Sequence, residues 1–484
     1  MNGDYAALAR ALAPETALVA GALAVLGLDL MWLRRRPAET RLRTAVGVAA
    51  LAVAVAVMLV LAVGRAGVVA GGALQVDTLA LAVRLGVLVL ALGALGIATG
   101  APIPRHPVEY VAVMLFAAAG LTLMAAANQL LLAFLAFELA SLSLYVLTGF
   151  DKARPESAEA ALKYFLFGGM AAAFFLFGLS LLYGLTGSIA FPAAGAVLAA
   201  PHSSPLAAVA LVMVLVAFGF KVAAAPFHLW APDVYQGAPA PTAAFIASAS
   251  KLAGYGLFAR LLWAGTTPGA EGGVPGWLPV VAVLAGVSLL LGNLVALAQT
   301  DVRRLLAYSA IAHAGALLLG VMTAGRAGFG PLVYYAATYG LASLGAFGVI
   351  AAVERGGGCR RLEDLAGLYR RSPLLAGCLT VFVLSLAGIP PLAGFFGKFA
   401  VFAAALRFDG PTGPAGGLAL LAIALTVVAL YYYLVILKQA LVAAPAPHNG
   451  GRIAVPQPAA LTLAVTAGLI VLLGVFPSLV LGWF

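Results

Sequence analysis

Long apolar runs recur from one end of the chain to the other, separated by short polar segments. A run of about 20 apolar residues is long enough to cross a hydrocarbon layer of about 30 Å as an α-helix. The pattern predicts an all-α, polytopic membrane protein. Its fourteen expected spans lie near residues 15–33, 43–64, 78–100, 108–126, 129–149, 161–186, 205–226, 240–264, 278–298, 304–324, 331–353, 373–405 (interrupted), 416–440 and 455–481.

Basic residues divide unevenly between the two sets of loops that these spans define. Eighteen of the 27 lysines and arginines fall in loops after odd-numbered spans, and only Arg10, Arg65, Arg326 and Arg407 fall on the opposite side. Loops rich in Lys and Arg stay in the cytoplasm. The chain is therefore predicted to lie in the bacterial inner membrane with both termini on the outer side.

Composition agrees with a membrane protein, because 64% of the 484 residues are hydrophobic and only 9% are charged. Soluble domains carry about 25% charged residues. The net charge of +10 comes mostly from loop residues, so it reports topology and predicts no nucleic-acid partner. The two cysteines, Cys359 and Cys378, have no CxxC partner, and no nucleotide-binding loop is present. Neither a metal site nor a cofactor site is predicted.

Charged side chains inside a membrane span are costly and usually serve ion or proton paths. Two of those predicted here, Arg84 and Arg260, are expected to snorkel toward an interface. The six ionisable side chains considered in this light are Arg84, Glu138, Lys221, Lys251, Arg260 and Lys398.

The three lysines Lys221, Lys251 and Lys398 lie deep in their spans, and Glu138 stands alone within LLLAFLAFELASLSLYVL. Pro226 interrupts the helix that carries Lys221, since proline leaves an earlier carbonyl unpaired. A broken helix beside a buried cation is typical of transport sites. Burial favours the neutral lysine, so these amines are expected to load and release protons, with Glu138 acting on Lys221. The alternative is that the charges form structural pairs.

Two histidines and a fourth lysine are weaker candidates for proton transfer. Imidazole titrates near physiological pH, so His313, which lies inside a span, is predicted to relay protons. His228 follows Pro226, and there a relay and a hydrogen-bonded helix end are equally good interpretations. Lys163 begins a span and is either a proton carrier or a cytoplasmic flank. Tyr431–Tyr433 are interpreted as core or interface aromatics.

A faint internal repeat divides the chain. Residues 162–180 resemble residues 306–322, and the proline-broken span with Lys398 mirrors the one with Lys221. Weak internal similarity and paired broken helices indicate a transporter built from repeats. Two five-helix units with broken helices are predicted, flanked by three amino-terminal helices and one carboxy-terminal helix. The four parts are 1–104, 105–265, 278–440 and 441–484.

Six segments together resemble the antiporter-like membrane subunits of respiratory complex I, the NADH–quinone oxidoreductase. Within that family subunit N is the best match, because subunit M usually has glutamate where Lys398 stands and subunit L ends in a long lateral helix. The resemblance covers about residues 105–440. The segments are FELASLSLYVL, EAALKYFLFG, FKVAAAPFHLWAPDVYQGAP, the stretch around Lys251, DVRRLLAYSAIAHAG and GIPPLAGFFGKF.

The resemblance implies a role for each buried ionisable residue. Glu138 matches the glutamate of the family's fifth span, and Lys221 matches the seventh-span lysine that pairs with it. Lys251 matches the eighth-span lysine in the middle of the path, and Lys398 matches the terminal lysine of the twelfth span. The implied function is proton translocation driven by NADH oxidation and quinone reduction in other subunits.

The resemblance also implies where the redox chemistry occurs. No cofactor is expected in this chain, and NADH, FMN, the iron–sulfur clusters and quinone belong to the assembled complex. The expected partners are the antiporter-like M subunit, the small K, J and A type subunits, and the lipid bilayer. Two alternatives stay open. One is a subunit of a multi-subunit cation/proton antiporter or membrane-bound hydrogenase, and the other is a structural spacer.

Overall fold

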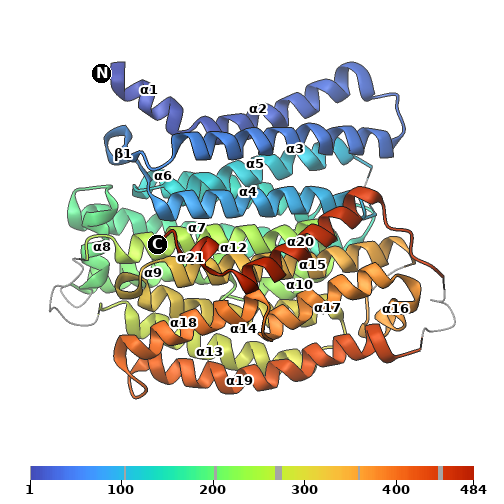
Figure 1. The fold of residues 1–484 in the computed structure, drawn as a ribbon. Coiled ribbons are helices and arrows are strands. Elements are labelled where there is room, and N and C mark those ends of the chain that lie inside the picture. The colour runs from blue at the N-terminus through green and yellow to red at the C-terminus, as the bar shows by residue number, and fades with distance from the viewer. Residues whose placement is uncertain (1, 103–104, 201–203, 267–274, 358–359, 445–450) are drawn as a thin grey trace.

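The computed structural model describes residues 2–102, 105–200, 204–266, 275–357, 360–444 and 451–484, so Cys359 lies outside the described residues. Its helices run roughly parallel to one another in an elongated bundle (Figure 1). The amino-terminal helices α2 (Ala13–Leu28) and α3 (Ala38–Val63) form one edge, and α13 (Leu278–Leu297) and α19 (Pro414–Leu437) form the other.

Within the described residues, 12 helices are long and apolar enough to span a membrane. α2 continues through a π-helical turn, η1 (Asp29–Leu33), and α19 continues through another, η6 (Lys438–Val442). The remaining spans are α4 (Thr78–Ala98), α5 (Pro107–Ala126), α6 (Leu130–Thr148), α7 (Pro155–Thr186), α9 (Pro205–Val222), α14 (Val302–Ala327), α15 (Gly330–Arg355) and α20 (Gln457–Val475).

Two further spans are built from shorter helices. One joins α11 (Ala240–Phe245), the π-helical turn η4 (Ile246–Ser250) and α12 (Lys251–Trp263), and the other joins α17 (Pro373–Ala387) and α18 (Ala393–Asp409). The prediction of an all-helical, polytopic membrane protein with 12 to 14 spans is therefore confirmed.

Short elements lie at the two ends of the bundle. A small antiparallel hairpin pairs β1 (Gly67–Val69) with β2 (Leu74–Val76) around a 3₁₀ turn, η2 (Ala70–Gly72). The short helices are α1 (Asn2–Ala11), α8 (Phe191–Ala199), α10 (Trp230–Gly237), η5 (Leu362–Leu365), α16 (Leu368–Arg371) and α21 (Ser478–Leu481).

Both predicted helix breaks are present. α9 stops at Val222 because Ala223 adopts a left-handed backbone conformation with φ 57°, and helical structure resumes only at Trp230. α17 stops at Ala387, where Gly388 has φ 87°, and α18 begins at Ala393. The prolines after each break cannot donate a backbone hydrogen bond, so neither helix can continue. Each break leaves helix-end carbonyls in the interior.

Two pairs of helices approach each other in the same way. A Cβ on Gly120 of α5 would overlap the backbone of Ala140 of α6, and a Cβ on Gly292 of α13 would overlap the backbone of Ala312 of α14. Small residues allow such close backbone contact. This correspondence supports the predicted five-helix repeats by pairing α6 with α14, whereas the likeness between 162–180 and 306–322 pairs α7 with α14. The domain boundaries stay a prediction.

The expectation that two arginines snorkel toward an interface is wrong. Arg84 of α4 is buried, and its Nη2 lies 3.0 Å from Glu15 of α2. Arg260 of α12 donates to both carboxylate oxygens of Asp77, at 2.8 and 2.7 Å. Each arginine finds a carboxylate on an element distant in sequence, which position along a single helix does not reveal.

We predict that Gly292→Ala destabilises the protein by about 1–3 kcal/mol, because the added methyl group forces α13 and α14 apart. The measurement is thermal unfolding of the purified chain in detergent. The control is Gly377→Ala in α17, where a Cβ would meet nothing within 4 Å. Equal melting temperatures for the two variants would contradict the prediction.

Candidate functional site

Lys221 and Glu138 lie side by side near the break in α9. The amine of Lys221 is buried, donates to Ser141 Oγ at 3.1 Å and lies 4.7 Å from the centre of the Phe137 ring. Glu138 is three residues before Ser141 on α6, so both project from the same side of that helix. Its Oε1 is buried and has no hydrogen-bond partner among the described residues. The two charges are therefore neighbours without direct contact.

Lys251 begins α12, directly after the π-helical turn η4. Its amine donates to the carbonyl oxygen of Ala310 at 2.7 Å and lies 5.5 Å from the centre of the Tyr339 ring. π-Helical turns inside helices frequently mark functional positions. Gly254, one turn further, leaves room for the stem of Lys221, whose Cγ would lie 3.1 Å from a Cβ there. α12 thus packs against both lysines.

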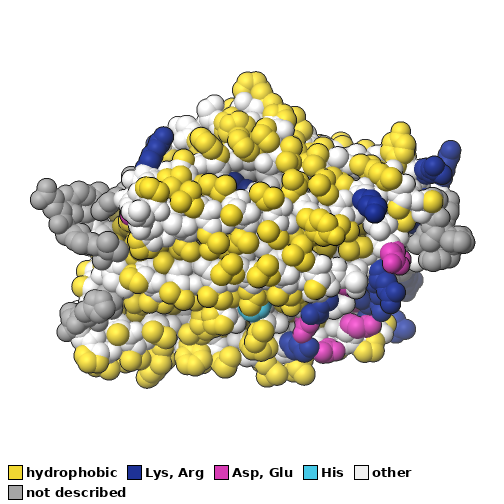
Figure 2. Space-filling view, turned by 90° about the horizontal axis from the view of Figure 1, so that it is seen from below, with side chains coloured by type: hydrophobic (Ala, Val, Ile, Leu, Met, Phe, Trp, Pro, Cys, Tyr) yellow, Lys and Arg dark blue, Asp and Glu magenta, His cyan; other side chains and the backbone are white. Residues whose placement is uncertain are grey.

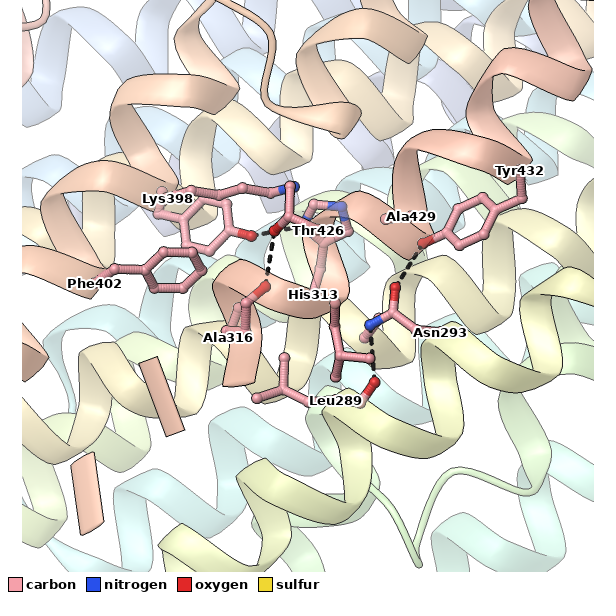
Figure 3. A pocket seen from close by; sticks show the side chains of 13 residues that line it. Leu289, Asn293, His313, Ala316, Lys398, Phe402, Thr426, Ala429 and Tyr432 are labelled. Atoms are coloured by element: carbon pink, nitrogen blue, oxygen red, sulfur yellow. Dashed lines mark hydrogen bonds between the residues drawn. The ribbon is translucent and has the colours of Figure 1, made fainter. Parts of the chain in front are cut away.

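Lys398 and His313 line the same small cavity (Figure 3). The amine of Lys398 donates to the carbonyl oxygen of Ala387 at 3.0 Å. The cavity has a volume of about 20 Å³, which is room for about one water molecule. Its other polar lining residues are Asn293, Tyr335, Thr426 and Tyr432. The site thus combines an amine, an imidazole and several hydroxyls around one water-sized space.

The fold therefore collects five predicted site residues into one buried row that crosses five helices. Glu138 of α6 and Lys221 of α9 lie at one end, Lys251 of α12 lies in the middle, and His313 of α14 and Lys398 of α18 lie at the other end. The spans of α14 and α15 beside the row are the most completely buried of the 12. The row is thus shielded from lipid at its centre.

Lys163 lies away from this row, in a group of ion pairs at one end of the bundle. Its amine is 2.6 Å from Asp233 and 2.7 Å from Glu159. Asp233 also accepts from Arg304 at 2.6 Å. Burial alone would raise the pKa of the Asp233 carboxyl, but the hydrogen bonds from Lys163 and Arg304 outweigh it and hold the pKa below its usual value. Lys163 here is a surface ion-pair partner.

His228 lies in the link between α9 and α10. It is buried, and its Nδ1 has no hydrogen-bond partner in the part of the chain that the structure describes. Neither His228 nor Lys163 hydrogen-bonds to a lysine of the row in the described ranges. Both therefore stay predictions as proton carriers.

The charged segment before α14 anchors a loop, as its sequence indicates. Asp301 accepts hydrogen bonds from the backbone of Arg303 and Arg304 and so caps α14. The Arg303 guanidinium pairs with Glu354 of α15. Charged side chains gather toward this end of the molecule in Figure 2, whereas the rest of the visible face is largely apolar. A cavity of about 120 Å³ opens among them.

Sequence reasoning missed the polar side chains that surround the row. Tyr335 and Tyr433 hydrogen-bond to His313, and Tyr339 lies under Lys251. Tyr432 and Tyr433 are core residues, as predicted, but their hydroxyls also face polar partners. The spacing of Tyr335 and Tyr339, four residues apart inside one span, is the signal that could have indicated a polar helix face.

Comparison with known proteins agrees with this geometry. The family model described as NADH:quinone oxidoreductase/Mrp antiporter, TM, matches residues 127–426. NADH-quinone oxidoreductase subunit N 2 from Acidobacterium capsulatum is 46% identical over 99% of this chain and 99% of its own length. A chain of respiratory complex I from Thermus thermophilus, with bound aureothin, has a TM-score of 0.80 at 36% identity and covers 97% of this chain and 98% of its own.

A chain of the Mrp complex from Dietzia sp. has a TM-score of 0.81 at 22% identity, covers 98% of this chain and 96% of its own, and shows the shared fold alone. The fold and the buried row define an antiporter-like membrane subunit. The chain belongs to the NADH:quinone oxidoreductase/Mrp antiporter family, and within it to the subunit N branch of NADH-quinone oxidoreductases. The resemblance inferred from the sequence is confirmed.

We predict that Asp233→Asn lowers the melting temperature near neutral pH, because the amide leaves Lys163 and Arg304 without an anionic partner. The folded pKa lies below the unfolded value of about 3.9. The carboxylate therefore stabilises the fold fully above that value and loses its effect as pH falls through the folded pKa.

The measurement is the difference in melting temperature between the parent and Asp233→Asn in detergent. It should be constant from about pH 8 to about pH 5 and shrink below about pH 4. The control is Asp151→Asn, whose carboxylate forms no ion pair in the described residues. A difference that stays constant at all these pH values would contradict the assignment.

Proposed function

We propose that protons cross this subunit along the buried row from Glu138 and Lys221, through Lys251 and His313, to Lys398. The chain is a proton-translocating membrane subunit N of the proton-pumping NADH:quinone oxidoreductase. The redox chemistry takes place elsewhere in the complex, and this chain contributes the membrane path.

One observation carries this proposal. Among the described residues, each of the three buried lysine amines donates to a neutral oxygen, and none lies within 4.0 Å of a carboxylate. The buried arginines Arg84, Arg260 and Arg303 are all paired with carboxylates. An arginine keeps its proton in proteins, whereas a buried lysine can lose it. The unpaired amines are therefore the groups that can change charge.

Glu138 acts as the electrostatic control on Lys221. A carboxylate that moves toward an amine favours the charged amine, and withdrawal favours release of its proton. The Oε1 of Glu138 has no hydrogen-bond partner to hold it among the described residues. Ser141, which accepts from Lys221, offers the amine a neutral partner in the meantime. Lys251 then passes the proton toward His313 and Lys398.

Lys163 and His228 complete the proposal at the charged end of the molecule. His228 lies between the break in α9 and the ion pairs around Asp233. We assign both residues to the approach from the cytoplasm. The redox groups, FMN and the iron–sulfur clusters, together with the NADH and quinone sites, belong to other subunits. The direct neighbours are the M-type antiporter-like subunit and the small K, J and A type subunits.

We predict that Lys221→Ala leaves a complex that assembles but pumps protons at least about tenfold more slowly, because the first amine of the row is lost. The measurement is proton uptake coupled to NADH oxidation in membrane vesicles, with assembly checked on a native gel. The control is Lys152→Ala, an exposed lysine before α7.

Assembled Lys221→Ala complex that pumps normally would overturn the proton path and favour a structural spacer. Purification of the chain without NADH-oxidising subunits, together with cation/proton exchange in vesicles, would instead favour the antiporter alternative. The shared fold with the Mrp complex is what keeps that alternative in the test.

The orientation we propose places the charged end of the molecule and Arg370 in the cytoplasm, and Arg407 outside. After replacement of Cys359 and Cys378 by serine, a single Arg407→Cys variant should react with an impermeant maleimide in intact spheroplasts. The matched Arg370→Cys variant should react only after permeabilisation. The reverse pattern would invert the topology.

A further inference from the structure

The ring of His313 is held between two tyrosine hydroxyls, one on each ring nitrogen. Nδ1 lies 2.7 Å from the hydroxyl of Tyr335 on α15, and Nε2 lies 3.1 Å from the hydroxyl of Tyr433 on α19. The Tyr433 hydroxyl also hydrogen-bonds to Ser309 Oγ, one turn before His313 on α14. All four side chains are buried. They form one hydrogen-bonded chain, Ser309–Tyr433–His313–Tyr335.

This chain has only two self-consistent arrangements. A neutral imidazole presents one donor and one acceptor nitrogen, and each hydroxyl donates one hydrogen. In the first arrangement Ser309 donates to Tyr433, Tyr433 donates to Nε2, and the hydrogen on Nδ1 is donated to Tyr335. In the second arrangement every bond is reversed. The tautomer of His313 and the direction of both tyrosine hydroxyls are therefore coupled.

The chain lies between two lysines of the proposed path. On one side, Lys251 donates to Ala310, the residue after Ser309, and the Tyr339 ring separates Lys251 from His313. On the other side, Tyr335 lines the cavity of about 20 Å³ together with Lys398.

We propose that Tyr433 and Tyr335 are relay residues, which carry a proton into and out of His313. The inference rests on the proposed function. Starting from the first arrangement, a proton binds Ser309 Oγ, whose own proton passes to Tyr433. The proton of Tyr433 forms a bond to Nε2, while the bond between Nδ1 and its hydrogen breaks and that proton moves to Tyr335.

Tyr335 completes the transfer by releasing its original proton to the amine of Lys398, directly or through the single water molecule for which the cavity has room. One proton enters, one leaves, and His313 returns to its neutral form as the other tautomer. Every bond of the chain then has the reversed direction, so the hydroxyls must turn before the next proton passes. This turn gives the relay a step that depends on both tyrosines.

Three consecutive tyrosines on α19 provide a matched set for the test. Tyr433 contacts His313, whereas Tyr432 is equally buried but donates to Asn293 Oδ1 at 3.2 Å. Tyr431 is 63% exposed. Replacing each by phenylalanine removes one hydroxyl, and only Tyr433→Phe removes one from the chain. Tyr432→Phe therefore measures the cost of losing a buried hydroxyl that has no part in the relay.

The experiment measures proton pumping by assembled complex in vesicles, in H₂O and in D₂O. Tyr433→Phe and Tyr335→Phe should each pump about tenfold more slowly with an increased solvent isotope effect, since proton transfer becomes rate-limiting. Tyr432→Phe and Tyr431→Phe should pump within about twofold of the parent with an unchanged isotope effect.

Two results would overturn the proposal. In one, Tyr433→Phe and Tyr335→Phe match Tyr432→Phe in both rate and isotope effect. In the other, neither variant assembles although Tyr432→Phe does, which would assign the pair a structural role. Lys221→Ala separates the two levels. If Lys221→Ala is inactive while the tyrosine variants pump normally, only the relay fails, whereas normal pumping by Lys221→Ala removes the path itself.

Discussion

The structure depends on holding lysine amines in a low-dielectric interior without a carboxylate beside them. An isolated charge at this depth costs several kcal/mol, so the fold must supply partial charges instead. The broken helices do so. Lys221 lies in the last turn of α9, and Lys398 donates to the last carbonyl of α17. Helix carboxyl ends carry partial negative charge, which offsets part of the cost while leaving each amine free to lose its proton.

The middle lysine is held differently, and that difference suits a transit position. Lys251 donates to a carbonyl in the interior of α14, which is already part of a helix, and has a tyrosine ring as its other neighbour. It has no helix end at its side comparable to those at Lys221 and Lys398. Its charged form is therefore the least compensated of the three, so a proton that arrives there is the most readily passed on.

Properties that a single segment determines were predictable from the sequence. Apolar runs set the spans, prolines and Gly388 set the breaks, and isolated charges marked Glu138 and the three lysines. Partners on distant segments were not predictable. Asp77 lies 183 residues from Arg260, and Tyr433 lies 120 residues from His313. Packing of whole helices brings these groups together, and no local pattern records it. The faint repeat likewise suggested pairing α7 with α14, whereas close backbone contacts pair α6 with α14.

The two ends of the row lie near the lateral surface, while its centre is sealed. Leu135 and Leu142, on the Glu138 face of α6, are exposed, and Phe399 beside Lys398 is exposed as well. Between them, Lys251 and His313 are enclosed by α14 and α15. In a low-dielectric interior charges act on one another with little screening. A change of charge at Glu138 is therefore passed along the row toward Lys398, and the sealed centre prevents water from cancelling it on the way.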